Sequence, residues 1–131
     1  MNKKLITGTG IFFAIIFATT VGGALLLTQP LVNATEEYLV LISQGRIDQA
    51  FQMTTGKVQA AVNFIEFEEA NSESLLAKYV DVSWNHRSIT GDSGELQGTL
   101  YTSDDVYSEV GISVTLEKEN GKWKIFYVEL W

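Results

Sequence analysis

An uncharged stretch of 31 residues, Leu5 to Thr35, lies near the start of the chain and limits how this part of it can fold. Its first 24 residues, Leu5 to Thr28, form an apolar run. As a helix rising about 1.5 Å per residue, this run would extend roughly 36 Å. That length exceeds a hydrocarbon core of about 30 Å. The run therefore predicts a transmembrane helix over residues 5–28, preceded by a short N-terminus at residues 1–4.

The charges that flank the apolar run predict its orientation. Lys3 and Lys4 precede it, and Glu36 and Glu37 are the first charges after it. The positive-inside bias then keeps the N-terminus in the cytoplasm and leaves the C-terminal domain outside the inner membrane, in the periplasm or its equivalent. A cleavable signal peptide is the alternative, because residues 32–34 fit a cleavage site, although a signal core has only about 7–15 residues.

Four small residues recur every four positions within the run, at Gly10, Ala14, Ala18 and Gly22. In a helix they would share one face, and small side chains allow a second membrane helix to approach closely. This spacing predicts association with another membrane protein or with a second copy of the chain. The alternative interpretation is that Gly and Ala are simply frequent in membrane helices.

Pro30 is predicted to end the membrane helix, because its ring disfavours helical geometry at the preceding residue. Residues 29–34 are then a linker, and residues 35–131 form one small domain. The chain has 16 acidic and 9 basic residues, and without the two N-terminal lysines the domain carries 16 acids against 7 bases, or −9. This charge excludes a nucleic-acid partner. The absence of cysteine excludes disulfides and thiolate sites.

Helical spacing of apolar residues predicts two or three short helices at the start of the domain. Tyr38, Leu41 and Ile42 follow the helical period, and Gly45 ends it. Residues 47–51 form a further short amphipathic segment, and residues 58–65 carry apolar side chains at i, i+3, i+4 and i+7. Residues 71–78 fit either a last helical turn or a loop.

From Tyr79 the apolar period changes to two, which is typical of half-buried strands. Four strands are predicted, over residues 79–87, 95–102, 106–119 and 122–131, with turns rich in Gly, Asp and Ser between them. The predicted fold class is therefore α+β, with two to three short helices packed on a four-stranded antiparallel meander.

The dipeptide Asn120-Gly121 is the strongest hairpin signal in the sequence. If it forms a two-residue turn, the numbers of facing residues sum to 241, so that Val114 faces Tyr127 on the core side. An apolar stripe is then left on the outer face of the last strand, formed by Phe126, Val128 and Leu130. Such a stripe indicates a covered surface, with a partner, a second copy or the chain's own helix as the cover.

Two segments resemble the NTF2-like, or cystatin-like, superfamily. Tyr38–Phe51 is similar to the opening element of that family, a helix, a glycine and a short helix with alanine, and Glu119–Ile125 is similar to its closing hairpin. The resemblance covers residues 35–131 and implies a cone of helices on a curved sheet. Small bacterial members with a lipoprotein head or a membrane span, including VirB8-type scaffolds, share this layout.

The resemblance implies that any chemistry would lie inside the cone. The candidate pocket residues are Tyr38, Trp84, His86, Trp123, Tyr127 and Glu129. His86 and Glu129 could act together as an acid/base pair if they converge, but a lone strand histidine is more often structural. A single histidine excludes a His-rich metal site, and no calcium-loop motif is present. We expect no metal and no cofactor.

Taken together, the sequence favours a non-catalytic, single-pass, membrane-anchored interaction module, an accessory or assembly subunit of a membrane complex. Two alternatives stay open. One is a small-molecule-binding protein that uses the cone pocket, and the other is an enzyme that uses His86.

Overall fold

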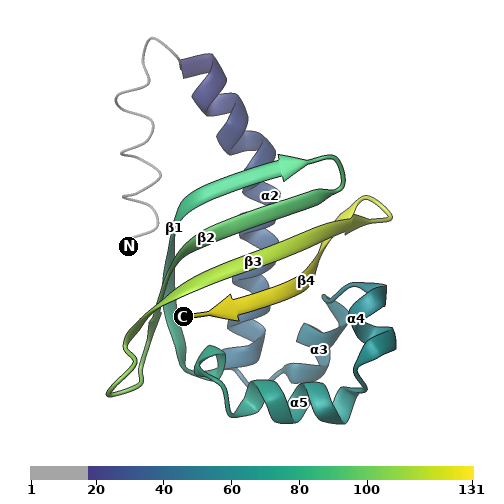
Figure 1. Ribbon diagram of the computed structural model, residues 1–131, viewed down its shortest axis with the longest axis vertical. Coiled ribbons are helices and arrows are strands. Elements are labelled where there is room, and N and C mark those ends of the chain that lie inside the picture. The colour runs from purple at the N-terminus through teal and green to yellow at the C-terminus, as the bar shows by residue number, and fades with distance from the viewer. Residues whose placement is uncertain (1–17) are drawn as a thin grey trace.

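The computed structural model describes residues 18–131, and the surroundings of side chains from residue 26 onward. The helices come first, namely α2 (Ala18–Ser43), α3 (Ile47–Gln52), α4 (Gly56–Ala61), α5 (Phe64–Ser72) and the 3-10 helix η1 (Leu75–Lys78). The strands follow, namely β1 (Tyr79–Thr90), β2 (Ser93–Thr102), β3 (Glu109–Glu119) and β4 (Lys122–Leu130). Figure 1 shows α2 running behind the sheet and α3, α4 and α5 gathered at one end, beside β4. This arrangement confirms the predicted α+β class.

The long helix α2 passes through Pro30 without a break. The predicted linker at residues 29–34 is therefore wrong, since these residues are helical. Leu31 and Val32, directly after the proline, are 0% and 4% exposed, whereas the proline itself is exposed. A proline inside a helix costs about 3 kcal/mol. Burial of its neighbours against the sheet offsets that cost, which sequence rules for an isolated helix do not include.

The sheet is a simple antiparallel meander with strand order β1-β2-β3-β4. The four predicted strands are confirmed, but some of their ends differ. β1 continues to Thr90 and β2 begins at Ser93, so their turn is shorter than expected, and β3 begins only at Glu109. Asn120 and Gly121 have φ angles of 52° and 78°. Positive φ at both positions is what a type I′ hairpin requires. The Asn-Gly signal therefore identifies the turn correctly.

The predicted helix over residues 58–65 is two helices, α4 and α5. Asn63 separates them, because its side chain accepts a hydrogen bond from the Glu66 backbone N–H at 2.9 Å while the Glu66 carboxylate accepts one from the Asn63 N–H at 3.2 Å. This reciprocal capping box starts a new helix. Apolar spacing continued through residue 65 and concealed the boundary. Residues 75–78, which fitted either a turn or a loop, form η1.

A β-bulge in β4 changes the register of the last hairpin. The expected pairing holds as far as Ile125, after which Phe126 is an extra residue in the ladder. Val114 therefore faces Val128 and not Tyr127, so this part of the predicted register is wrong. A bulge inserts one residue and thereby reverses the side of every side chain that follows it.

The bulge moves two residues of the predicted outer stripe into the domain. Val128 and Leu130 pack against the core, opposite Val114 and Ile112, and only Phe126 of the stripe is exposed. The predicted outward placement of Val128 and Leu130 is therefore wrong. Strict alternation along the whole strand predicts the outward placement, whereas in the structure the alternation shifts by one residue after Ile125.

A second bulge lies in β1, where Asn85 is the extra residue between Trp84 and His86. Trp84 faces Gly98 of β2, and a Cβ atom at Gly98 would overlap the carbonyl oxygen of Ser83. Only glycine fits at this close approach of the two backbones. His86 consequently turns to the outer face, and Arg87 turns inward.

The core lies between α2 and the inner face of the sheet. Helix α2 packs against β1, β2 and β4, and Leu39 and Ile42 are among its most deeply buried residues. The fully buried sheet residues are Val82, Leu96, Leu100, Ile112, Val114 and Leu116. Burial of each such side chain contributes about 1.5–3 kcal/mol. One contiguous core for residues 26–131 fits a single small domain.

Part of the predicted membrane span, residues 5–17, lies outside the described residues, as do Gly10 and Ala14 of the small-residue face. Ala18 and Gly22 belong to α2. Within residues 18–131, no helix combines the length and the hydropathy needed to cross a membrane. The anchor remains a prediction from the sequence.

Candidate functional site

The cone interior, where the sequence suggested a pocket, is filled by core side chains. Tyr38 and Trp84 are each 3% exposed. Burial raises the pKa of the Tyr38 phenol well above its usual range. The Trp84 indole donates a hydrogen bond to the Glu36 carboxylate of α2 at 3.3 Å. These two residues therefore join α2 to the sheet, and Trp123 is only partly buried against the same core.

The other three predicted pocket residues lie on the outer face of the sheet because of the bulges in β1 and β4. These residues are His86, Tyr127 and Glu129. The His86 imidazole Nε2 lies 3.4 Å from the Glu95 carboxylate on the neighbouring strand. Tyr127 and Glu129 lie on the outer side of β4. Because β1 and β4 are the two edges of the sheet, three strand spacings, about 14 Å, separate His86 from Glu129. The proposed acid/base pair does not assemble.

Arg87 takes the inward position that the sequence assigned to His86. Its guanidinium lies between β1 and α2, where desolvation lowers its pKa and the nearby Glu36 carboxylate opposes that shift. The Glu36 carboxylate thus accepts a hydrogen bond from Trp84 and attracts the Arg87 guanidinium across the interface between helix and sheet. Sequence periodicity missed this cluster, because it appears only when Asn85 is counted as a bulge.

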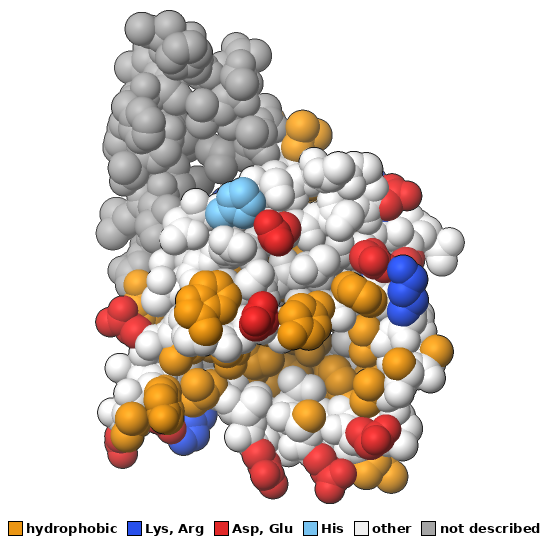
Figure 2. Space-filling model, viewed as in Figure 1, with side chains coloured by type: hydrophobic (Ala, Val, Ile, Leu, Met, Phe, Trp, Pro, Cys, Tyr) orange, Lys and Arg blue, Asp and Glu red, His pale blue; other side chains and the backbone are white. Residues whose placement is uncertain are grey.

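The outer side of β4 carries a row of exposed aromatic side chains. Phe126, Tyr127 and Trp131 are 37%, 57% and 65% exposed. Figure 2 shows large hydrophobic side chains along this strand, interrupted by an acidic one, on the face turned toward the viewer. The acidic residue between Tyr127 and Trp131 in the sequence is Glu129. We call these four residues, Phe126, Tyr127, Glu129 and Trp131, the aromatic row.

Two of the aromatic rings are held in place by neighbouring residues. The Trp131 indole lies directly over Gly111 of β3, so close that a Cβ atom there would overlap the ring. Lys57 of α4 holds its ammonium 5.5 Å from the centre of the Phe126 ring and also lies 3.3 Å from the Glu117 carboxylate. The row is therefore contacted by β3 at Trp131 and by α4 at Phe126.

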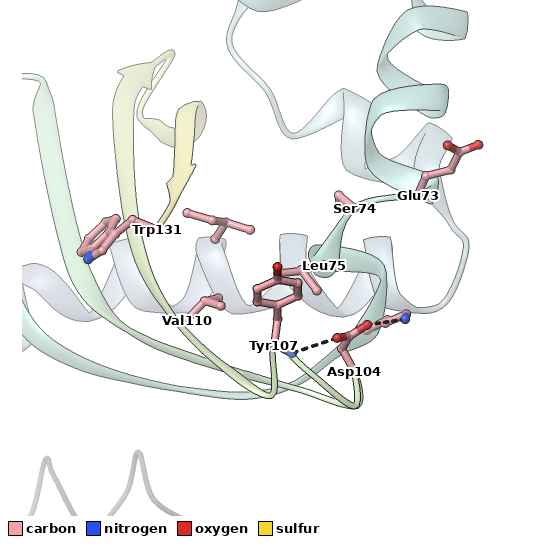
Figure 3. A pocket seen from close by; sticks show the side chains of 9 residues that line it. Glu73, Ser74, Leu75, Asp104, Tyr107, Val110 and Trp131 are labelled. Carbon is pink, nitrogen blue, oxygen red and sulfur yellow. Dashed lines mark hydrogen bonds and ion pairs between the residues drawn. The ribbon is translucent and has the colours of Figure 1, made fainter.

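A groove of about 430 Å³ opens beside the end of β4, between η1 and the inner side of the sheet. Its lining residues are Glu73, Ser74, Leu75, Lys78, Asp104, Tyr107, Val110, Leu130 and Trp131. Figure 3 shows the Tyr107 ring beside Leu75, with Val110 and Trp131 on the strand side. The groove thus has an apolar floor and begins where the aromatic row ends.

The rim of the groove is fixed by an ion pair and a tight loop. Lys78 donates a hydrogen bond to the Asp104 carboxylate at 2.7 Å, and the Tyr107 backbone N–H donates one to the same carboxylate at 2.9 Å (Figure 3). The Val106 backbone N–H donates a third hydrogen bond to Asp104, at 3.0 Å. The hydrogen bond from Lys78, followed by those from the backbone, lowers the pKa of Asp104 to about 2. Asp104 raises the pKa of Lys78 in return. This loop carries Tyr107 into the groove wall.

The predicted acid/base pair of His86 and Glu129 does not form, since His86 lies on β1 and Glu129 on β4. Within residues 18–131, no group of three or more His, Asp or Glu side chains is arranged to hold a metal ion. The features that remain are the aromatic row and the groove, both at the β4 edge. The sequence analysis named Phe126 as an outer residue and Tyr127 and Glu129 as pocket residues on the core side, but did not name Trp131. In a strand without the bulge, Trp131 would share the core side with Tyr127 and Glu129.

Comparisons with known proteins identify the fold but no family. No family model matches the sequence, and no curated protein matches it. A SEC-C motif containing protein from Rhodopseudomonas palustris has a similar structure, with a TM-score of 0.53 and 11% identity over 69% of this chain and 70% of that one. A designed NTF2-like protein is similar with a TM-score of 0.53 and 13% identity over 73% of this chain and 91% of the design.

These likenesses define the class of fold. The described residues adopt an α+β fold similar to that of the NTF2-like design, with helices on one face of an antiparallel sheet. At 11% and 13% identity they carry no statement about function.

Proposed function

We propose that this protein is a non-catalytic interaction module that binds a protein partner through the aromatic row of β4. The observation that carries the proposal is the exposure of Phe126, Tyr127 and Trp131 along one strand. Aromatic side chains dominate the binding energy of protein interfaces, and Trp and Tyr are enriched among the residues that contribute most.

Order in the row supports this proposal. A surface that is rigid before binding loses less side-chain entropy when a partner arrives. Gly111 lets the Trp131 ring lie flat on β3, and Lys57 holds Phe126 from the other side. These two contacts would reduce the side-chain entropy that the row loses on binding.

Charge indicates the chemistry of the partner. The domain carries −9, and Glu129 lies within the aromatic row. A partner with basic residues would gain both from the carboxylate and from cation–π contact with the Tyr127 and Trp131 rings. A nucleic acid would be repelled.

The proposal keeps residues 5–28 as a membrane anchor, with the N-terminus in the cytoplasm and the domain outside the inner membrane. Its support is the uncharged stretch and the lysines before it. The small residues Gly10, Ala14, Ala18 and Gly22 would add a second contact within the bilayer. In this arrangement the protein is an accessory subunit of a membrane complex.

A paired-variant pull-down tests the proposal. The tagged full-length protein is extracted in mild detergent from its own cells, and the native mass and the co-eluting proteins are determined. We expect a stoichiometric partner that is lost when Tyr127 and Trp131 are both changed to Ala. The matched control changes Ile65 and Val106 to Ala, two exposed apolar residues away from the row. Retention of the partner by the Tyr127/Trp131 variant would contradict the proposal.

A further inference from the structure

The β4 strand has a second binding feature, its unpaired backbone edge. β4 is the last strand of the sheet, so one side of its backbone bonds to β3 and no further strand lies on the other side among the described residues. Gly111 and Trp131 exchange both backbone hydrogen bonds, at 2.8 and 3.1 Å. In an antiparallel ladder, the residues on either side of such a pair direct their backbone N–H and C=O groups away from the partner strand. The N–H and C=O groups of Leu130 and Val128 therefore point to the free edge.

The same edge already pairs with an extended segment at one position. The Ile125 N–H donates to the Met53 carbonyl, and the Thr55 N–H donates to the Ile125 carbonyl, each at 2.9 Å. This single parallel bridge covers the start of β4, before the chain turns away into α4. Among the described residues, no strand or bridge continues it along Val128 and Leu130.

The groove lies where a continued strand would place its side chains. Leu130 lines the groove and is one of the two residues whose backbone faces the edge. Leu75 and Val110 complete its apolar floor. Side chains of an added strand alternate between the two faces of the sheet. Those on the inner face would enter the groove, and those on the outer face would lie beside the aromatic row.

We propose that the free edge of β4 binds an extended segment of the partner as a fifth strand, with an apolar residue in the groove and a basic residue beside Glu129. The inference rests on the proposed interaction function and names the form of the partner. Main-chain pairing supplies affinity in this mode of recognition, and the pockets for alternate side chains supply specificity.

Charge favours a basic segment over a second copy of this chain. If two β4 strands paired edge to edge about Glu129, the two Glu129 carboxylates would face each other. Like charges directly opposite across a sheet are destabilising. A lysine or arginine at that position instead adds an attractive cross-strand pair, and its neighbours can contact the Tyr127 and Trp131 rings.

A defined peptide tests the inference. The probe is acetyl-Lys-Val-Lys-Leu-Lys-Val-Lys-amide, whose basic and apolar residues alternate with the strand period. Two control peptides are used, one with the same composition but all lysines first, and one with Glu in place of Lys. Backbone hydrogen exchange of the full chain in a neutral detergent is measured by NMR with and without each peptide.

Strand addition predicts a residue-specific result. Exchange at the Val128 and Leu130 amides should slow about tenfold or more at saturation, whereas the Tyr127 and Glu129 amides, which already face β3, should change little. Leu75→Lys should weaken binding about tenfold or more, because the lysine would replace an apolar residue of the groove floor with a charged one. Ile65→Lys, on the exposed side of α5, should leave binding unchanged.

The other outcomes overturn the inference. Failure of the alternating peptide to bind, or equal binding of the lysine-first peptide, excludes strand addition. Slowing of the Val128 and Leu130 amides with protein concentration alone would assign the edge to a second copy. If the Tyr127/Trp131 variant loses its cellular partner while these amides stay unprotected by peptide, the interaction module stands and only the edge proposal fails.

Discussion

The indole ring of Trp131 rests on Gly111, the residue directly across the ladder from it. A methyl group at Gly111 would overlap the indole ring, so the smallest residue on β3 positions the most exposed aromatic ring of the row. Substitution of this glycine should therefore change the aromatic row without altering the charge or the hydrophobicity of the surface.

Gly111→Ala is predicted to displace the Trp131 ring and to lower the free energy of unfolding by about 1–2 kcal/mol, the cost of a local overlap. Urea unfolding measures the energy, and the NMR shift of the Trp131 indole N–H reports the ring. The control is the same change in a Trp131→Ala background. There Gly111→Ala should cost almost nothing, and an equal cost in both backgrounds would show that the ring is not the cause.

Gly98→Ala is predicted to be more severe, because the new Cβ would overlap the backbone at Ser83 and lie 2.9 Å from the Trp84 Cα. Backbone atoms at the β1 bulge cannot move aside, so we expect a loss of about 3 kcal/mol or more, enough to prevent folding of a marginally stable domain. Circular dichroism and urea unfolding of the purified variant measure the loss.

Gly94→Ala serves as the matched control for Gly98→Ala. Its Cβ would meet the Leu31 methyl groups at 2.7 and 2.8 Å, which are the flexible end of a side chain. We expect a cost of about 1–2 kcal/mol and a folded domain. Similar losses for both glycines would contradict the difference drawn between a backbone and a side-chain obstacle.

The comparison between sequence and structure shows where period-2 reasoning fails. Asn120-Gly121 identifies the last hairpin correctly, and the pairing is right as far as Ile125. A phase change was present in the sequence, because the aliphatic residues Val128 and Leu130 are out of step with Ile125. Counting an odd interval between apolar positions would have indicated a bulge in β4. Because of this bulge, Tyr127 and Glu129 lie on the outer face and not in the predicted pocket.

The β1 bulge had a weaker signal. Ile89 is out of step with Trp84, but the residue that turns inward between them is Arg87, which a polarity pattern assigns to solvent. Its inward position follows from the bulge at Asn85, and the acidic residue near it there is Glu36 of α2, which is 51 positions earlier in the chain. Local patterns contain no such long-range pairing, and therefore the Glu36, Trp84 and Arg87 cluster could not be predicted.

Pro30→Ala tests the continuity of α2. Alanine restores the backbone donor that proline lacks and removes the ring from the helix interior. It also raises the conformational entropy of the unfolded chain, which opposes part of this gain. We expect a net gain of about 1–2 kcal/mol in the free energy of unfolding, measured by urea titration. Gln29→Ala, on the neighbouring residue, should change stability by only a few tenths. A loss on Pro30→Ala would indicate that the proline ends a helix, as the sequence first suggested.

Stability in acid should depend on the ion pair at the groove rim. The folded-state pKa of Asp104 is about 2, below its unfolded value of 3.8, since Lys78 and two backbone N–H groups stabilise the carboxylate. The resulting contribution is fully present above about pH 4 and is lost as the pH falls through about 2. Asp104→Asn should therefore flatten the dependence of the urea midpoint on pH between 4 and 2.

Asp105→Asn separates this effect from a general change in charge. Asp105 is the exposed neighbour of Asp104, and Asp105→Asn makes the net charge less negative by one unit, as Asp104→Asn does. The acid limb of the stability curve should stay as in the parent protein for Asp105→Asn and flatten only for Asp104→Asn. Because the Lys78–Asp104 pair is exposed, added salt should weaken the difference. Equal flattening by both variants would assign the acid sensitivity to the net charge of the domain and not to the loop that holds Tyr107.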